Sequence, residues 1–168
     1  MDKNKQKQSS YLSILRDRRP SAVADIIGGP LAPRLHGNVG FFVTPIGVLV
    51  SAELWGLPTG ERPCGGGVFG FHIHEGESCS GNADDPFANT GGHYNPAGCP
   101  HPFHAGDLPP LFCNNGYAWC ATITDRFKIE DIIGKTIVVH SSPDDFTSQP
   151  SGNSGVKIAC GEIYIPRL

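Results

Sequence analysis

From about residue 21 onward, the apolar residues come in short runs that are separated by glycine, proline and other turn-forming residues. Short apolar runs with such punctuation are typical of the strands of a β-sandwich or barrel. Turn signals such as Asn114-Asn115-Gly116 lie between the runs. The pattern predicts strands at residues 22–27, 37–43, 47–55, 68–74, 117–124, 136–140 and 157–164. We therefore expect an all-β fold.

Two segments, 75–115 and 141–156, do not follow the strand pattern. Both are rich in Gly, Pro, Ser, Asp and Asn. Loops of this length inside a compact domain are usually functional. The chemistry of the protein is therefore expected in or beside these two loops.

The first 19 residues differ in character from the rest of the chain. Residues 1–10 are polar and have no apolar periodicity, which predicts a disordered tail. Residues 11–19 predict one or two helical turns with Tyr11, Ile14 and Leu15 on one face. Such a helix either packs on its own domain or serves as an anchor for a partner or a membrane surface. The expected organisation is a tail at 1–19 with a short helix, followed by one domain at 20–168.

The composition supports a turn-rich protein and limits its partners. The chain has 22 glycines and 15 prolines, and only 17% of its residues are charged, which argues against a helix bundle. No apolar run approaches the roughly 18 residues that are needed to cross a bilayer. We expect a soluble protein with no nucleic-acid partner and no integral membrane segment.

The sequence leaves two compartments open. The apolar segment 11–15 is short, contains Ser13 and is followed at once by basic residues, so it does not have the pattern of a secretory signal. By default this favours the cytoplasm. The six cysteines, if oxidised, favour an extracytoplasmic site instead.

Histidines carry the strongest functional signal. Six of the seven histidines lie between residues 72 and 140, and only His36 stands apart. Imidazole is the commonest biological metal ligand, and a carboxylate is a normal ligand of zinc. Together with Asp107 the six make seven candidate ligands, which are too many for one tetrahedral ion. They suit two ions that share a ligand.

Three of these histidines belong to predicted strands. Alternate residues of a strand point to the same face, so His72 and His74 should project together from the segment 68–74. His140 ends the predicted strand 136–140 and could join them from a neighbouring strand. Three or four imidazoles on strands suit copper, which prefers nitrogen ligands and cycles between two oxidation states.

The other candidates lie in one loop. The spacing from His93 through His101 and His104 to Asp107 is compact and predicts one tetrahedral zinc site. His93 can also serve the copper site, because an imidazole has two nitrogens. No lysine or arginine lies between Arg62 and Arg126. Bound divalent ions would therefore be the main positive charges of this stretch.

The residues that carry this pattern resemble those of the copper-zinc superoxide dismutases, in particular the bacterial branch. The strongest matching segments are GFHIHEGESCSG, GGHYNPAGCPHPFHAGDLP, GKTIVVHSSPDD and GNSGVKIACG. The resemblance implies a flattened, eight-stranded Greek-key β-barrel, an immunoglobulin-like sandwich with long metal-binding and electrostatic loops. It also implies copper on His72, His74, His93 and His140, and zinc on His93, His101, His104 and Asp107.

The resemblance assigns roles to further residues. It implies that Asp144 links a copper histidine to a zinc histidine, here His72 and His101, which fits the general role of carboxylates in orienting ligating imidazoles. It implies a disulfide between Cys79 and Cys160. It also places Lys157 where the family usually has arginine, beside the copper, so we expect a lower but not abolished activity.

Four cysteines lie outside the family pattern. Cys113 and Cys120 flank the turn at Asn114-Asn115-Gly116 and could pair across a hairpin. Cys64 and Cys99 have no assigned partner. Cys99 lies two residues before His101, so a thiolate ligand of zinc is an alternative, although four ligands are already present.

The expected activity is the disproportionation of superoxide to oxygen and hydrogen peroxide, with copper and zinc as cofactors and with His93 and Lys157 as catalytic residues. Two alternatives stay open. One is a copper-binding or copper-delivery module of the same fold with little turnover, and the other is a structural module with inactive metal sites. Superoxide is the expected small-molecule partner, and the resemblance allows a homodimer.

Overall fold

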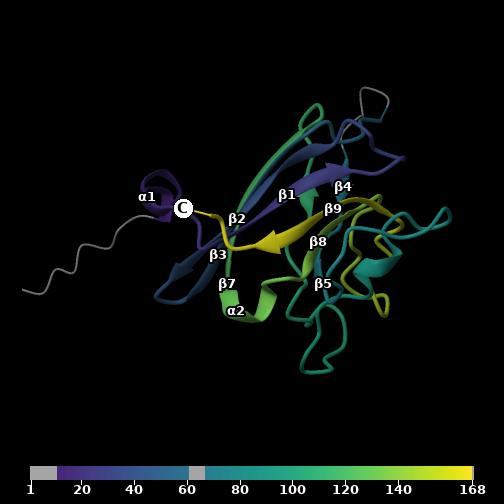
Figure 1. The fold of residues 1–168 in the computed structure, drawn as a ribbon. Helices are drawn as coiled ribbons and strands as arrows, with labels where there is room; N and C mark the ends of the chain where they lie inside the picture. The colour runs from purple at the N-terminus through teal and green to yellow at the C-terminus, as the bar shows by residue number, and fades with distance from the viewer. Residues whose placement is uncertain (1–10, 61–66, 168) are drawn as a thin grey trace, which may run out of the picture.

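The computed structural model describes residues 11–60 and 67–167, and the predicted disordered tail at 1–10 lies outside them. The regular secondary structure of the described chain is mostly antiparallel strand with little helix, as the sequence predicts (Figure 1). The strands are β1 (Ala22–Gly28), β2 (His36–Thr44), β3 (Gly47–Trp55), β4 (Val68–Phe69), β5 (Phe71–His74), β6 (Leu111–Phe112), β7 (Tyr117–Thr124), β8 (Thr136–His140) and β9 (Lys157–Tyr164). The helical elements are α1 (Tyr11–Asp17), the 3₁₀ turn η1 (Ala88–Thr90) and α2 (Ile129–Ile132).

Seven strands form one curled antiparallel sheet in the order β5-β8-β9-β1-β2-β3-β7. The remaining two, β4 and β6, pair separately. The last strand, β9, lies between β8 and β1. The first and last strands of the chain are therefore neighbours in the sheet. The all-β, barrel-like class is thus confirmed, although the strands are divided between a large sheet and a small one rather than making a regular set of eight.

The interior of the curled sheet holds the main apolar core. Strand β3 alternates in burial from Val50 to Trp55, as expected when one face of a strand is buried and the other is exposed to solvent. Strand β8 is buried at all five positions, because loops cover its second face. Phe41, Leu54, Ile73 and Ile137 are at most 1% exposed and pack in one cluster. The metal-ligand candidates of β5 and β8 therefore project from strands that are buried along their whole length.

The predicted strand 68–74 is interrupted at Gly70, which separates β4 from β5. The amide of Gly70 donates to the carbonyl of Ser142, and its carbonyl accepts from the amide of His140. A Cβ at Gly70 would lie 2.7 Å from Cβ of Ser154 and 3.2 Å from Cε1 of His72. Glycine at this position therefore allows the loop that carries Ser154 to pack directly on the histidine strand.

The N-terminal helix α1 packs on the outer face of the sheet. Ile14 is 3% exposed and contacts Phe42 and Leu49. The helix predicted at 11–19 is present, and its apolar face is used within its own chain. No helix of the described residues is long and apolar enough to span a membrane.

Candidate metal centre

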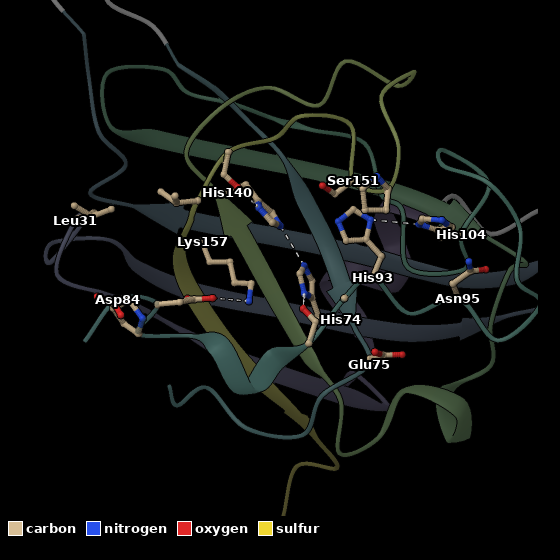
Figure 2. Close-up of a pocket in the computed structure, with 17 residues that line it drawn as sticks. Leu31, His74, Glu75, Asp84, His93, Asn95, His104, His140, Ser151 and Lys157 are labelled. Atoms are coloured by element: carbon tan, nitrogen blue, oxygen red, sulfur yellow. Dashed lines mark hydrogen bonds and ion pairs between the residues drawn. The ribbon is translucent and has the colours of Figure 1, made fainter. Parts of the chain in front are cut away.

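A pocket of about 680 Å³ lies beside the ends of β5 and β8. Its wall includes His74, His93, His140 and Lys157, which Figure 2 shows around one opening. The two long loops that the sequence left without strands supply most of the remaining wall. Residues that are distant in sequence thus meet at the place where the sheet ends and these loops begin.

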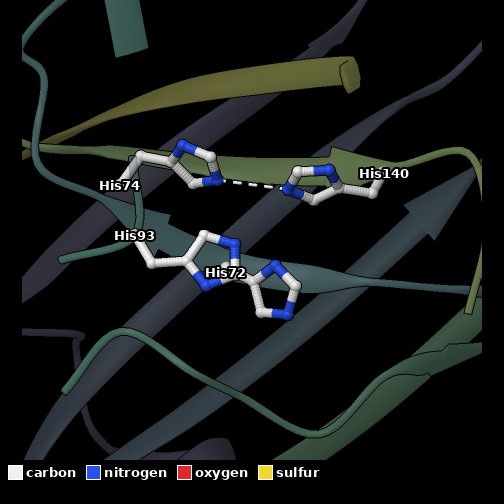
Figure 3. Close-up of side chains that lie close together, drawn as sticks. All are labelled: His72, His74, His93 and His140. Atoms are coloured by element: carbon white, nitrogen blue, oxygen red, sulfur yellow. Dashed lines mark hydrogen bonds between the residues drawn. The ribbon is translucent and has the colours of Figure 1, made fainter. Parts of the chain in front are cut away.

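The strand geometry brings the first histidines together. β5 pairs with β8, with His72 opposite Val138 and His74 opposite Thr136. His74 also forms an isolated bridge with His93. The ring nitrogens of His72, His74, His93 and His140 offer one ligand atom each within 4.8 Å of one another, and all four residues are buried (Figure 3).

The protonation of His74 and His140 shows that this cluster suits a cation. Nδ1 of His74 lies 2.9 Å from the carbonyl oxygen of Gly91, and Nδ1 of His140 lies 3.2 Å from that of Gly155. A carbonyl only accepts, so each Nδ1 carries the ring proton. In the neutral rings both Nε2 atoms then present lone pairs to each other, at 3.1 Å. Such a contact is repulsive unless a cation lies between the lone pairs.

The electrostatics keep these rings neutral in the metal-free protein. Burial lowers the pKa of His74 well below its usual value, and the neighbouring charges of His140 and His93 lower it further. Burial, followed by the nearby His72, lowers the pKa of His140 to about 3. Neutral imidazole is the form that binds metals.

The second cluster is built by the loop after His93. His93, His101, His104 and Asp107 also offer ligand atoms within 4.8 Å of one another. Oδ1 of Asp107 lies 2.7 Å from Nδ1 of His93 and 3.4 Å from Nδ1 of His104. Oδ2 of Asp107 lies 3.0 Å from Nδ1 of His101. A carboxylate and three imidazoles are an ordinary zinc ligand set.

Three buried ring nitrogens have no hydrogen-bond partner among the described residues: Nδ1 of His72, Nε2 of His93 and Nδ1 of His101. Nδ1 of His101 lies 3.0 Å from Oδ2 of Asp107, but the two atoms do not form a hydrogen bond. An unpaired buried polar atom costs about 1–3 kcal/mol. Two of these atoms belong to the first cluster and one to the second. Metal coordination would satisfy all three. The donor sets present therefore fit copper in the first cluster and zinc in the second.

Asp144 connects the two clusters through their outer nitrogens. Its Oδ2 lies 2.8 Å from Nε2 of His72, and its Oδ1 lies 2.9 Å from Nε2 of His101. Burial raises the pKa of Asp144, but hydrogen bonds from His72, the Phe146 amide and His101 outweigh it and hold the pKa well below the usual value. A charged acceptor here fixes the proton of both rings on Nε2 and leaves their Nδ1 atoms free to bind metal.

Gly152 allows the loop to pass over Asp144. Its φ is +66°, and a Cβ would fall on the Asp144 carboxylate and 2.7 Å from Nε2 of His101. A side chain at this position would therefore displace the bridge between the clusters.

Two residues that support the second cluster were not anticipated from the sequence. Gln149 accepts from the amide of His101 and donates to its carbonyl, at 2.9 and 2.8 Å. Arg126 donates through Nη1 to the carbonyls of Pro102 and His104. Neither residue has a local pattern that reveals its role. The position of Arg126, the first cation after a long stretch without any, is the one available signal.

Lys157 reaches the pocket from the start of β9. It lies opposite His140 in the β8–β9 ladder, where a bulge between Val139 and His140 shifts the register. Its Nζ donates to Oδ2 of Asp85, a contact drawn as a dashed line from Lys157 in Figure 2. It also donates to the carbonyl of Phe87. The cation that the sequence places beside the first cluster is therefore present there, and it already has a carboxylate partner. Asp85 was not among the residues that the sequence singled out.

The cysteines follow the expectations only in part. Cys79 and Cys160 form the predicted disulfide, which joins the loop after β5 to β9. The prediction of a disulfide between Cys113 and Cys120 across the hairpin is wrong, because both are free thiols. The turn pairs Asn114 with Tyr117, and in that register Cys113 would face position 118. Cys99 is free and belongs to neither cluster, and Cys64 lies outside the described residues.

The isolated histidine of the sequence lies apart in the structure too. His36 is exposed on β2 and stacks on Trp55, with ring centroids 5.9 Å apart. Its Nδ1 bonds to the carbonyl of Arg34.

Comparisons with known proteins agree with this geometry. Residues 35–163 match the family model described as copper/zinc superoxide dismutase. The chain is 34% identical over 155 residues to a Cu-Zn superoxide dismutase of Legionella pneumophila, which covers 84% of this chain and 89% of the relative. It is 36% identical over 144 residues to that of Escherichia coli K12, which covers 76% and 78%. The Cu/Zn superoxide dismutase structure from Brucella abortus superposes with a TM-score of 0.70 at 27% identity, covering 84% of this chain and 98% of that one.

Proposed function

The chain belongs to the copper/zinc superoxide dismutase family, and we propose that its two histidine clusters hold one copper and one zinc ion that share His93. It is a superoxide dismutase, an oxidoreductase that converts two superoxide anions and two protons into one oxygen and one hydrogen peroxide. The observation that carries the two-ion proposal is the position of His93, which contributes to both clusters while its buried Nε2 has no hydrogen-bond partner in the described chain.

The proposed ligand sets follow the two clusters. The copper ligands are His72, His74, His93 and His140, and the zinc ligands are His93, His101, His104 and Asp107. Bound copper supplies a one-electron redox couple, and bound zinc supplies a fixed positive charge without redox chemistry. Asp144 orients His72 and His101 from outside both sets.

The side chains of this chain have three tasks in the reaction. Lys157 provides a positive charge on the pocket wall and docks the anion. His93 takes up a proton at Nε2 in one half-reaction and returns it to the reduced product in the next, while its Nδ1 stays beside Asp107. The buried rings of His72 and His74 keep their positions on the rigid strand β5, so little reorganisation accompanies the reaction.

Complete ligand sets argue against the second candidate, a copper-delivery module with little turnover. A delivery protein must release its ion, whereas these clusters are buried and held by backbone carbonyls and by Asp144. A structural module with inactive sites is disfavoured by the three unpaired buried nitrogens.

One experiment separates these functions. The purified chain is reconstituted with both metals, and metal content and superoxide consumption are measured on the same sample. We expect about one copper and one zinc per chain, and a kcat/KM within reach of the diffusion ceiling of about 10⁸–10⁹ M⁻¹s⁻¹. Bound copper without turnover would indicate the delivery module, and absence of bound copper would indicate the structural module.

The disulfide bears on the compartment. A disulfide such as Cys79–Cys160 forms and persists most readily in an oxidising environment. We infer an extracytoplasmic site in place of the cytoplasmic default. Residues 20–168 are proposed as the catalytic domain and 1–19 as its appendage. A homodimer stays a prediction, which light scattering on the purified protein tests.

A further inference from the structure

Lys157 is the cation nearest to the proposed copper ligands on the pocket wall, and it is not free. Its Nζ lies 3.0 Å from Oδ2 of Asp85 and 3.1 Å from the carbonyl oxygen of Phe87. The Lys157 side chain is 16% exposed and that of Asp85 is 42% exposed. An ammonium has three N–H donors, so these two bonds leave one donor for an incoming anion.

Hydrogen bonds within its own loop hold Asp85 in position. Its Oδ1 accepts from the amide of Phe87 at 2.9 Å, and its own amide donates to Oδ1 of Asn82. Burial raises the pKa of Asp85, but the hydrogen bonds from Lys157 and the Phe87 amide, with the Lys157 charge, lower it by more. Asp85 is therefore a charged carboxylate at neutral pH.

The loop that carries Asp85 is itself anchored. Phe87 is 7% exposed and packs against Val138 and Cys160. Cys160 is covalently linked to Cys79, on the other side of the same loop. The carboxylate is thus held at a fixed position relative to β9, which carries Lys157. This distinguishes the pair from the mobile ion pairs of an open surface, which contribute little.

We propose that Asp85 is the positioning residue of Lys157 and that its carboxylate sets how strongly the pocket binds an anion. The carboxylate holds the ammonium against the wall and occupies part of its charge and hydrogen-bonding capacity. An anion that enters the pocket must share Lys157 with this resident negative charge. The inference rests on the proposed function for the identity of the anion, superoxide, but not for the contact itself.

The chain offers a matched control in the adjacent residue. Asp84 lines the same pocket and carries the same charge, and no hydrogen bond joins its side chain to Lys157 among the described contacts. Asp84→Asn removes one negative charge from the pocket. Asp85→Asn removes one as well, but it also releases the charge of Lys157. Its single amide oxygen can accept from Lys157 or from the Phe87 amide, but not from both. The difference between these variants reports the action of Asp85 through Lys157.

The first measurement is the binding of azide, a small anion, to the copper- and zinc-loaded proteins by absorbance titration. We expect Asp85→Asn to bind azide about fivefold more tightly than the wild type and Asp84→Asn to change affinity clearly less. In a Lys157→Met background, Asp85→Asn and Asp84→Asn should change the azide affinity by the same factor. Equal effects of the two substitutions, or an excess effect of Asp85→Asn that survives without Lys157, would overturn the role in anion affinity.

The second measurement needs no metal. The rate of acetylation of Lys157 by a neutral succinimidyl ester is followed by peptide mass spectrometry on the metal-free proteins. We expect Asp85→Ala, which removes the acceptor, to raise this rate about threefold or more, and Asp84→Ala to leave it near the wild-type rate. An unchanged rate in Asp85→Ala would overturn the positioning role.

The two measurements separate this inference from the proposed function. If the wild-type chain binds no copper, the proposed function fails, while the acetylation rates still decide whether Asp85 positions Lys157. If copper and turnover are present but Asp84 and Asp85 variants are indistinguishable in both measurements, the inference fails and the proposed function stands.

Discussion

Nδ1 of His93 lies 2.7 Å from Oδ1 of Asp107, while Nε2 of the same ring faces the first cluster without a hydrogen-bond partner in the described chain. One imidazole thus belongs to two candidate metal sites at once. No other residue is a member of both described clusters. The proposed two-ion centre therefore depends on this side chain more than on any other.

Replacing His93 should damage both sites together. We expect His93→Ala to reduce the affinity for both metals and to lower superoxide consumption at least about 100-fold, because each cluster loses a ligand. Metal content by mass spectrometry and rates by stopped flow measure these effects. His36→Ala is the control, because His36 is exposed and outside both clusters. Loss of only one metal in His93→Ala would contradict a shared ligand.

The carboxylate of Asp144 should control metal retention without being a ligand. We expect Asp144→Asn to weaken metal binding about 10–100-fold, because an amide group places its own N–H against one of the two imidazole N–H groups that Asp144 accepts. Competition with a chelator measures the affinity. Asp145→Asn is the matched control, since the side chain of Asp145 accepts, among the described contacts, only from Thr147 and Ser148 of its own turn. Equal metal retention in the two variants would show that the bridge is dispensable.

The metal-free protein should lose stability as the pH falls below about 6.5. The pKa of His140 is about 3 in the folded protein, and burial also lowers the pKa of His74 and His72. In the unfolded chain these rings take up protons near their ordinary pKa, so acid favours the unfolded state. The contribution of these neutral histidines to the free energy of unfolding is complete above about pH 6.5 and is lost as the pH decreases toward 3. Urea unfolding at several pH values tests this, and a flat profile between pH 7 and 4 would contradict it.

The disulfide should contribute strongly to stability. Cys79 and Cys160 are separated by 81 positions, and the chain-entropy model gives roughly 4–5 kcal/mol for a loop of this length, less any strain. We expect the double variant Cys79→Ser/Cys160→Ser to unfold about 3–4 kcal/mol more easily in denaturant. Cys99→Ser is the control, because Cys99 is a free thiol. A reducing agent should destabilise the wild type but not the double variant.

Lys157 should govern the electrostatic part of the rate. We expect Lys157→Met to lower kcat/KM about tenfold and to weaken its dependence on ionic strength, because a pocket cation draws the anion in. Lys157→Arg should raise kcat/KM about twofold, since the planar fork can hold the Phe87 carbonyl and an anion together. Stopped-flow rates between low and high salt provide the test. A wild-type rate that does not change with salt would show that steering is unimportant here.

The fold could be predicted well because its elements are local. The strands β3, β7, β8 and β9 have the limits that the apolar runs predict, since buried strand faces require apolar residues and turn-forming residues separate the runs. The missed elements are short: β6 has two residues and α2 has four. Segments of this length carry too few positions for a pattern. The break at Gly70 also escaped prediction, because its cause is the close packing of Ser154 and His72 against this glycine, and Ser154 is distant in sequence.

The candidate ligands could be predicted from the sequence, but the residues that support them could not. The residue types and spacings of the ligands are visible in the chain, because a strand fixes which side chains share a face and a compact loop brings its own members together. The supporting residues are not visible in this way. Gln149 contacts His101 across 48 positions, and Arg126 contacts Pro102 across 24. Such contacts leave no periodic trace. The failed pairing of Cys113 with Cys120 shows how an error of two positions in the register of a hairpin misleads.

The sequence by itself determined the class of fold, the strand positions and the set of histidines, because each depends on residue type and near-neighbour spacing. The roles of Lys157 and Asp144 came from the resemblance to the family and not from local spacing. Only the tertiary structure decided which ring nitrogens lack partners and that Lys157 is already paired with Asp85, 72 positions away. These features arise where the curled sheet brings distant loops into contact. Hydrogen-bond geometry at that meeting point, rather than any local preference of the chain, fixes them.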